Sequence, residues 1–285
     1  MKRNQTIILL IAPAMIWFLI FMVFPLSSMV YTSFLDPNDP TLSTPADPIT
    51  ANYEKFLNPL YAKITLRSFQ LAIGTLFVTL IMGYPFAYFA TFSKWGKAIL
   101  LVQFLPFLSP FIIRIFAWRV ILGKTGIINY TLMGLGITNE PVTWLLFSNI
   151  SVLIGQSYLF LPFVTIPIYI SLRRIDKNLL EASKDLGAGK IRTFINITLP
   201  LSKPGILIGS IITVVPSVAA FLGPTLLGGV EWKQLIADVI FVHFYAGQNK
   251  PFGSAVTVFV LSLTIIMAII GVKSVGVQQL FRGKE

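Results

Sequence analysis

Few residues in this sequence have the types and spacing needed for covalent chemistry. The chain of 285 residues has no cysteine and a single histidine, His243, so a thiolate or histidine metal site has no ligand set. HExxH and GxSxG motifs are absent from the sequence. Two glycine–lysine fragments, 123–125 and 187–190, lack the leading glycine or the Ser/Thr of a phosphate-binding loop. We therefore expect no catalytic residue, metal or cofactor on this chain.

The polar residues are instead concentrated in one segment, Arg173–Gly205. This segment contains seven Lys/Arg and three Asp/Glu, and long uncharged runs lie on both sides of it. A charged segment between apolar runs must lie in water or bind a soluble partner. The segment is therefore the first candidate for a functional site.

The composition of the whole chain is that of a membrane protein. Hydrophobic residues make up 55% of it, charged residues only 12%, and the mean hydropathy is +0.80. A soluble domain is about 25% charged. The net charge of +11 does not indicate nucleic-acid binding, because the basic residues fall in short blocks between apolar runs and form no continuous stripe.

The apolar runs predict a single all-α membrane domain with six transmembrane helices. A helix needs about 20 apolar residues to cross the hydrocarbon core. The third run becomes long enough only if Arg114 and Arg119 face protein or water, or extend to the interface. Prolines within the spans favour a transporter over a simple anchor. The expected spans are about 7–34, 68–93, 98–122, 143–172, 204–229 and 251–272.

The distribution of Lys and Arg predicts that both termini are cytoplasmic. With the N-terminus inside, fourteen of the 22 Lys/Arg fall on cytoplasmic segments and six on external ones. The 173–203 segment is then cytoplasmic, and the proline-rich 35–66 loop is extracytoplasmic. The first apolar run is too long for a signal peptide and has no A-x-A site after it, so we expect a retained helix.

Within the charged segment, the residues predict one short amphipathic helix. Asp176 and Asn178 are both good N-caps, and Asn178 with Glu181 has the spacing of a capping box. Leu179, Ala182 and Leu186 would share one face. Gly187 is placed to end the helix in a left-handed conformation. A helix of about ten residues is not stable alone in water, so it must pack against the bilayer, against the chain's own spans or against a partner.

The segment also resembles a known family motif. Glu181-Ala182-Ser183, Gly187 and Leu199-Pro200 are similar to the EAA…G…LP signature of the permease subunits of ABC importers, with Ser183 in place of the second alanine. The resemblance implies the type I importer permease fold and makes the segment a coupling helix. Its ATPase-coupling residues would be Leu179, Glu181, Ala182, Ser183, Leu186 and Gly187.

The resemblance also implies a set of partners. These are a second permease subunit, an ATPase dimer that binds ATP and Mg²⁺, and an extracytoplasmic solute-binding protein, together with the membrane lipid and a small-molecule substrate. Hydrolysis would take place on the ATPase, so this chain would be a transporter subunit and not an enzyme. The expected location is the bacterial cytoplasmic membrane.

Further segments resemble the spermidine/putrescine branch of the family. They include 52–61, Gly83–Ala87, Arg114 with Trp118, Pro224–Gly229 and Pro251-Phe252-Gly253. One departure concerns the cargo, because relatives often carry an acidic residue where this chain has Ala219-Ala220. A polyamine could bind aromatic faces instead. Candidate residues of the translocation pathway are Arg114, Phe116, Trp118, Tyr158, Phe160 and Phe221.

Several alternatives remain open at this point. The aromatic candidates could face lipid or pack inside the bundle, and Arg114 could extend to the external interface or attract an anion. The cargo could be a different small solute, such as an anion, an opine or an amino-acid-like molecule. A carrier that works without ATP, or a membrane scaffold, would also account for the apolar runs.

Overall fold

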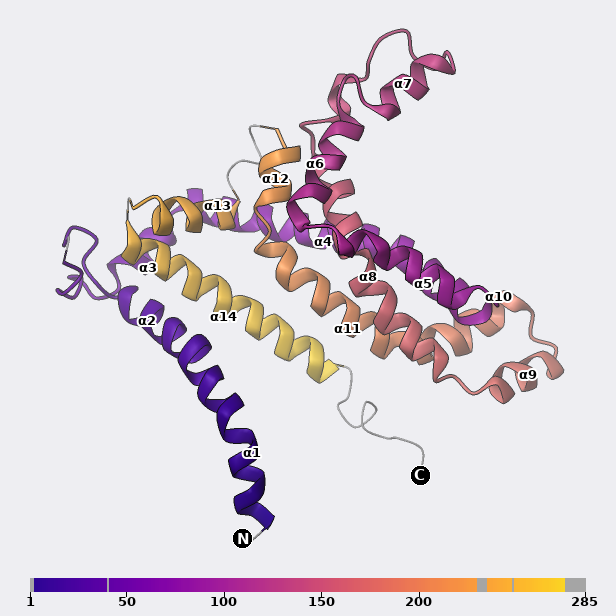
Figure 1. Ribbon diagram of the computed structural model, residues 1–285, viewed down its shortest axis with the longest axis horizontal. Coiled ribbons are helices and arrows are strands. Elements are labelled where there is room, and N and C mark those ends of the chain that lie inside the picture. The colour runs from indigo at the N-terminus through magenta and orange to yellow at the C-terminus, as the bar shows by residue number, and fades with distance from the viewer. Residues whose placement is uncertain (1–2, 40, 230–234, 248, 275–285) are drawn as a thin grey trace. The chain divides into compact units, whose positions relative to one another are not determined.

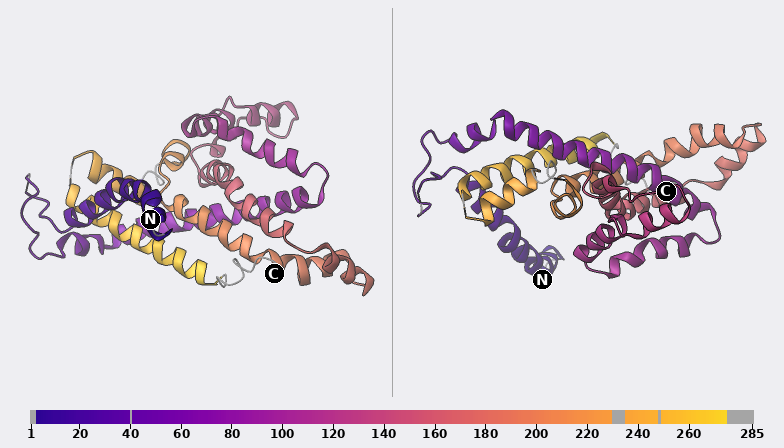
Figure 2. Two further views of the ribbon diagram at one scale, coloured as in Figure 1. Left: turned by 60° about the horizontal axis from the view of Figure 1, so that its bottom comes forward. Right: turned by 90° about the horizontal axis from the view of Figure 1, so that it is seen from above.

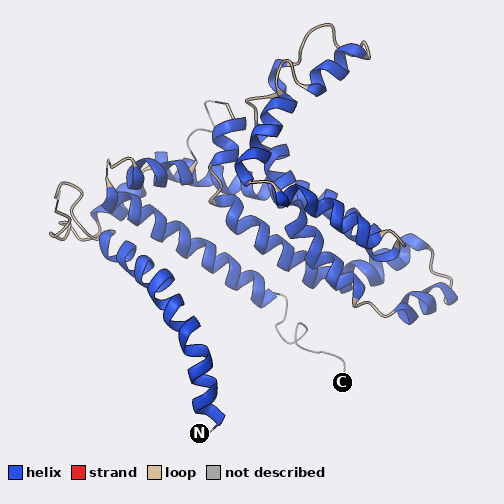
Figure 3. Cartoon of the chain, viewed as in Figure 1, coloured by secondary structure: helices blue, strands red, loops and turns tan. Residues whose placement is uncertain are grey.

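A computed structural model of the chain describes residues 3–39, 41–229, 235–247 and 249–274, and this part is helical with no β-strand (Figures 1 and 3). Four basic residues counted for the orientation, Lys2, Lys233, Arg282 and Lys284, lie outside the described residues. The predicted cytoplasmic position of the termini stays a prediction.

The helices follow one another with short connections. The α-helices are α1 (Arg3–Phe18), α2 (Phe24–Thr32), α3 (Ala51–Phe56), α4 (Pro59–Phe92), α5 (Gly96–Phe104), α6 (Phe111–Leu122), α7 (Ile127–Gly134), α8 (Asn149–Arg173), α9 (Lys177–Asp185), α10 (Lys190–Thr193), α11 (Leu199–Val218), α12 (Leu222–Leu227), α13 (Ile236–Ile240) and α14 (Lys250–Ser274). The π-helical turns are η1 (Leu19–Val23), η4 (Phe194–Thr198) and η6 (Phe241–Tyr245), and the 3₁₀ turns are η2 (Leu105–Leu108) and η3 (Thr143–Leu145).

The described residues contain five helices long and apolar enough to cross a membrane, or six if one bent pair counts as a span. This agrees with the expected all-α membrane fold. The five are Leu10–Thr32, Pro59–Phe92, Asn149–Arg173, Lys190–Val218 and Lys250–Lys273. Their bounds differ from the expected ones mainly at the second span, which begins nine residues earlier, at Pro59, and at the fifth.

The third expected span, 98–122, is not one straight helix. The helical segments Gly96–Leu108 and Phe111–Gly134 meet at an angle of 98°. Between them, Ser109 and Pro110 are extended, with ψ of 147° and 143°. The reason is local, because Pro106 and Pro110 cannot donate backbone hydrogen bonds and Pro110 disfavours helical geometry at Ser109.

The fifth expected span, 204–229, is also divided. The helix that contains it begins at Lys190, fourteen residues earlier, and ends at Val218. The chain leaves the helix at 219–221, and α12 then starts a new short helix. The break at 219–221 therefore lies inside the span that was predicted to be continuous from 204 to 229.

The chain divides into two compact units. The first contains residues 1–64 and 238–263. Here Asn52 donates hydrogen bonds to the carbonyl oxygens of Ser33 (3.0 Å) and Leu35 (2.9 Å), which ties α3 to the end of α2. Phe56 packs on Phe259, with ring centroids 4.8 Å apart. The 52–61 segment is thus anchored within its own unit.

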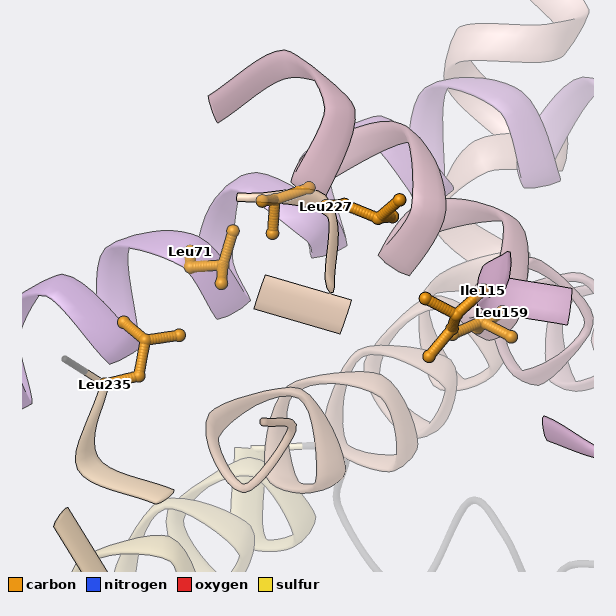
Figure 4. Close-up of a cluster of buried hydrophobic side chains, with 6 residues drawn as sticks. Leu71, Ile115, Leu159, Leu227 and Leu235 are labelled. Atoms are coloured by element: carbon orange, nitrogen blue, oxygen red, sulfur yellow. The ribbon is translucent and has the colours of Figure 1, made fainter. Parts of the chain in front are cut away.

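The second unit contains residues 65–237 and 264–285. Its centre is the pair α8 and α11, which lie side by side (Figures 1 and 2). One buried apolar cluster joins α4, α6, α8 and α12 (Figure 4). Its buried members are Leu71, Ile115, Val152, Leu159, Leu227 and Leu235. The α9–α10 segment lies beyond the ends of α8 and α11 in this unit (Figure 1).

Candidate functional site

The coupling helix predicted from the sequence is α9, and its start is capped by one aspartate. The Asp176 carboxylate accepts a hydrogen bond of 3.0 Å from the backbone N–H of Asn178. The predicted capping box of Asn178 and Glu181 is therefore wrong, because Asn178 already lies in the first turn of the helix. Asp176 is the N-cap instead of Asn178, and its carboxylate also interacts favourably with the positive end of the helix dipole.

Gly187 ends α9 as predicted. Its φ is +78°, in the left-handed region that favours glycine. The N–H of Ala188 donates to the carbonyl of Ser183 (3.0 Å), and the N–H of Gly187 donates to the carbonyl of Lys184 (2.8 Å). These two bonds are the Schellman motif, which satisfies the last carbonyls of a helix and turns the chain sharply.

One side of α9 is held by its own chain. Ser183 is 8% exposed, and its hydroxyl lies 2.9 Å from the hydroxyl of Thr193 on α10. The motif position where relatives carry a second alanine thus makes a buried hydrogen bond here. This bond joins α9 to α10.

Other side chains of α9 are uncovered. Leu179 is 50% exposed and Leu186 is 88% exposed, and Glu181 and Ala182 are exposed as well. Full burial of a leucine side chain is worth about 1.5–3 kcal/mol. The exposed leucines therefore give this charged helix a small apolar face with room for a partner. Leu179 also lines a groove of about 620 Å³ with residues of α8 and α11.

The segment after α9 connects it to the spans. Phe194 begins the π-helical turn η4 and lies edge-on to Tyr84 (5.7 Å) and Tyr88 (5.8 Å) of α4. The Tyr84 hydroxyl lies 2.9 Å from the hydroxyl of Ser202 on α11. A displacement of α10 would therefore act on both α4 and α11.

The six pathway candidates do not converge on one point. Trp118 of α6 and Tyr158 of α8 meet edge to face, with centroids 5.5 Å apart. Phe160 is buried, whereas Phe116 is 45% exposed. Phe221 lies at the start of α12. Their role in transport stays a prediction, and the contact that brings two of them together here is the one between Trp118 and Tyr158.

Arg114, the sixth candidate, lies against aromatic rings. Its guanidinium carbon is 4.3 Å from the ring centroid of Phe107 and 5.8 Å from that of Phe111. Its Nε and Nη1 atoms are buried and have no hydrogen-bond partner among the described residues. Buried donors without partners are unfavourable, and cation–π attraction of about 0.5–2 kcal/mol per ring offsets part of that free-energy cost.

Sequence reasoning missed the interface between α8 and α11. On α11, small residues recur every four positions at Gly205, Gly209, Thr213 and Ser217, and all four are buried. A Cβ at Gly205 would lie 2.4 Å from the Pro167 carbonyl oxygen. Small residues at this spacing allow two membrane helices to approach closely. The four-residue repeat of small residues in the sequence could have predicted this close helix–helix contact.

Polar side chains gather at one end of this interface. Gln156 of α8 is 1% exposed, and its Oε1 accepts a hydrogen bond of 2.9 Å from the Thr75 hydroxyl of α4. Its Nε2 has no partner among the described residues, and the same holds for the hydroxyls of Ser157, Thr213 and Ser217. Each unsatisfied buried group costs about 1–3 kcal/mol. These polar groups are a second candidate site, which lies well away from α9 along the chain.

Comparison with known proteins shows the family. Residues 75–282 match the model of the family described as "Binding-protein-dependent transport system inner membrane component". The match covers well over half of the 285 residues. The chain belongs to this family of ABC importer permeases and is a multi-pass protein of the inner membrane.

Curated relatives point to one branch of the family. The chain is 35% identical over 255 residues to the "Spermidine/putrescine transport system permease protein PotB" of Escherichia coli K12, covering 89% of this chain and 90% of the relative. Identity to PotB of Haemophilus influenzae is 36% over 257 residues, with coverages of 89% and 87%. The permease protein YdcU of E. coli K12 is 29% identical over 265 residues, with coverages of 88% and 83%.

Solved structures share the fold at low identity. A chain of a bacterial alginate ABC transporter, in complex with its alginate-bound periplasmic protein, has a TM-score of 0.76 at 18% identity, with coverages of 95% and 93%. A chain of the MetNI methionine ABC transporter has a TM-score of 0.58 at 18% identity, with coverages of 76% and 94%. The helical arrangement is thus that of ABC importer permeases.

Proposed function

We propose that this chain carries a polyamine, of the spermidine or putrescine type, across the inner membrane. The support is the 35% identity over 89% of the chain to a permease named for spermidine and putrescine. The chain would work with a second permease subunit, two copies of a cytoplasmic ATPase and an extracytoplasmic solute-binding protein. ATP and Mg²⁺ would bind the ATPase.

In this proposal the ATPase binds the permease at α9. The observation that carries it is the pairing of exposed Leu179 and Leu186 with a buried Ser183–Thr193 hydrogen bond. Ser183 holds α9 to α10, and the exposed leucines would offer apolar surface to a groove on the ATPase. Glu181 would contact the ATPase as well. Gly187 would set the turn that keeps α9 at the correct angle.

Transport would follow from differential binding to two conformations. The loaded binding protein outside and the closed ATP-bound dimer inside would each favour one arrangement of the spans. The contacts of Phe194 with Tyr84 and Tyr88 are the route by which a movement of α9 and α10 reaches α4.

A different small solute is the second candidate cargo. It is favoured by Arg114 in the third span and by the lack of any Asp or Glu from Lys55 to Asn139. An anion would be attracted to such a charge distribution, and a polyamine would be repelled.

Uptake by the reconstituted transporter tests the proposal. The permease is co-expressed with its neighbouring subunits, purified in detergent and placed in liposomes. We expect ATP-dependent uptake of labelled spermidine or putrescine. Uptake of an anionic solute in its place would replace the polyamine proposal by the second candidate. Purification without any ATPase would count against the coupling role of α9.

A further inference from the structure

The register of α8 against α11 places particular residues at the same level. A Cβ at Gly205 would lie 2.8 Å from Cα of Ile168, and a Cβ at Gly209 would lie 3.1 Å from Cα of Val164. The helices are therefore antiparallel, and four residues forward on α11 correspond to four residues back on α8. By this register, Ser217 lies at the level of Gln156.

The chemistry of the interface changes along its length. At the level of Gly205 and Gly209 the two backbones approach closely, with Ile168 and Val164 opposite the glycines. Further along, Thr213 is 0% and Ser217 is 1% exposed, and neither hydroxyl has a hydrogen-bond partner in the described part of the chain. Alanine at positions 213 and 217 would also allow the helices to pack closely. Close packing therefore does not explain why these two residues carry hydroxyl groups.

Gln156 is held in place with its amide nitrogen free. Its Oε1 accepts from Thr75, which fixes the side chain between α4 and α8. A Cβ at Gly223 would lie 3.9 Å from its Nε2, so the amide is directed toward the start of α12. Just before that point the chain leaves the helix at 219–221. Interrupted helices at membrane depth are tolerated where they line a wet or solute-filled path.

The polar groups at this end of the interface carry no charge. Hydroxyl oxygens accept hydrogen bonds from ammonium groups, whereas a carboxylate would hold a multiply charged cation far more strongly. A pathway must bind its cargo well enough to admit it and weakly enough to release it. Neutral acceptors, together with apolar Phe160 at the level of Thr213 in this register, suit a chain of methylene groups interrupted by ammonium groups.

We propose that Gln156, Ser157, Thr213 and Ser217, the α8–α11 polar cluster, form an uncharged contact site for the cargo, in which the three hydroxyl oxygens and the second lone pair of Gln156 Oε1 accept hydrogen bonds from its ammonium groups. The site is closed in this conformation and opens to water when α11 moves relative to α8. This inference rests on the proposed polyamine transport. It accounts for a cation pathway that has no acidic residue in its spans.

Cysteine accessibility tests the site without reference to the cargo. Because the chain has no cysteine of its own, Ser217→Cys and Thr213→Cys each introduce a single thiol. Ser210→Cys is the matched control, since Ser210 lies on the same helix and its hydroxyl is already bonded to the Ile206 carbonyl at 2.7 Å. The complete transporter, with partner subunits free of cysteine, is treated with a charged, water-soluble methanethiosulfonate with and without ATP and vanadate.

We expect the Ser217 and Thr213 thiols to react at least tenfold faster in one nucleotide state than in the other. The Ser210 thiol should show no such change. Thiols at 213 and 217 that stay unreactive in both states, or that follow the control, would overturn the proposal, because they would show a permanently dry interface.

Uptake measurements complete the test. Gln156→Leu should lower the uptake of labelled spermidine at least tenfold at equal amounts of assembled transporter. Normal uptake by Gln156→Leu would contradict the site. A wild-type transporter that does not move spermidine would overturn the proposed cargo alone, because thiol reactivity is measured independently of it.

Discussion

The guanidinium carbon of Arg114 lies 4.3 Å from the ring centroid of Phe107, on the other side of the bend that divides the third span. Arg114 belongs to α6, and Phe107 belongs to the 3₁₀ turn η2 that ends the preceding arm. Ser109 and Pro110 lie between them. The contact therefore joins the two arms of the 98° bend, which gives this intramembrane arginine a structural role in addition to any role in transport.

Removal of this contact should destabilise the bend. Phe107→Leu keeps an apolar side chain but loses a cation–π interaction of about 0.5–2 kcal/mol. We expect a lower Tm in detergent for Phe107→Leu and for Arg114→Gln, with a double variant that loses less than the sum of the two. Phe116→Leu is the control, because Phe116 is 45% exposed on the same helix. Additive losses would show that the two residues act independently.

The conformation of Gly187 should matter more than its size. A Cβ at Gly187 would meet no atom within 4 Å, so only the positive φ opposes substitution. Gly187→Val should cost about 1–2 kcal/mol at the end of α9 and lower ATP hydrolysis stimulated by the loaded binding protein. Gly187→Asn should keep most of the stimulated ATP hydrolysis, since asparagine tolerates the left-handed region. Equal activities of the two variants would contradict the turn's role in coupling.

Leu186 should affect ATPase binding and leave the permease itself unchanged. At 88% exposure, its replacement by serine removes almost no packing within this chain, and the Tm of the isolated permease should stay constant. Loss of its burial against a partner should weaken ATPase binding about tenfold or more. Co-purification and titration with the ATPase measure this. Leu135→Ser is the control, because Leu135 is 70% exposed at the end of α7.

Gly205 should be the most sensitive small residue of the α8–α11 interface. A Cβ there would lie 2.4 Å from the Pro167 carbonyl oxygen and 2.8 Å from Cα of Ile168, so the two backbones would have to separate. We expect Gly205→Ala to lower the Tm and the yield of folded permease. Gly189→Ala is the matched control, since no atom lies within 4 Å of its Cβ position. Equal Tm values would show that the helices can move apart at little cost.

His243 predicts a dependence of stability on pH in the first unit. Burial, and secondarily the charge of Lys55, lower the pKa of His243 below its ordinary value of 6.5. The folded chain then favours neutral imidazole, so stability is highest above about pH 6.5 and falls as the pH drops below it. Thermal unfolding at pH 7.5 and 5.5 measures the loss. His243→Gln should show a smaller difference, and an unchanged difference would exclude His243 as its source.

The sequence predicted α9 well because its signals are local. Asp176 and Gly187 act on neighbouring backbone groups, and both fulfil a role that their residue types favour. The break of the third span was also encoded locally, in Pro106 and Pro110, but hydropathy averages over such residues. Gln156 was missed for a different reason. Its significance depends on Thr75, which is far away in the sequence and donates a hydrogen bond to it only in the folded bundle, and on Ser217, which the register of α8 against α11 places at its level.

The helical run from Lys190 to Val218 has one further consequence. It spans 29 residues without a gap, or about 44 Å at 1.5 Å per residue. One end is fastened to α9 by Thr193, and the other carries Ser217. A rod of this length works as a lever. A tilt of about 5° at the Lys190 end would displace the far end by about 4 Å, more than the width of a water molecule. Such leverage would let a small movement at one end of the helix open a barrier at the other.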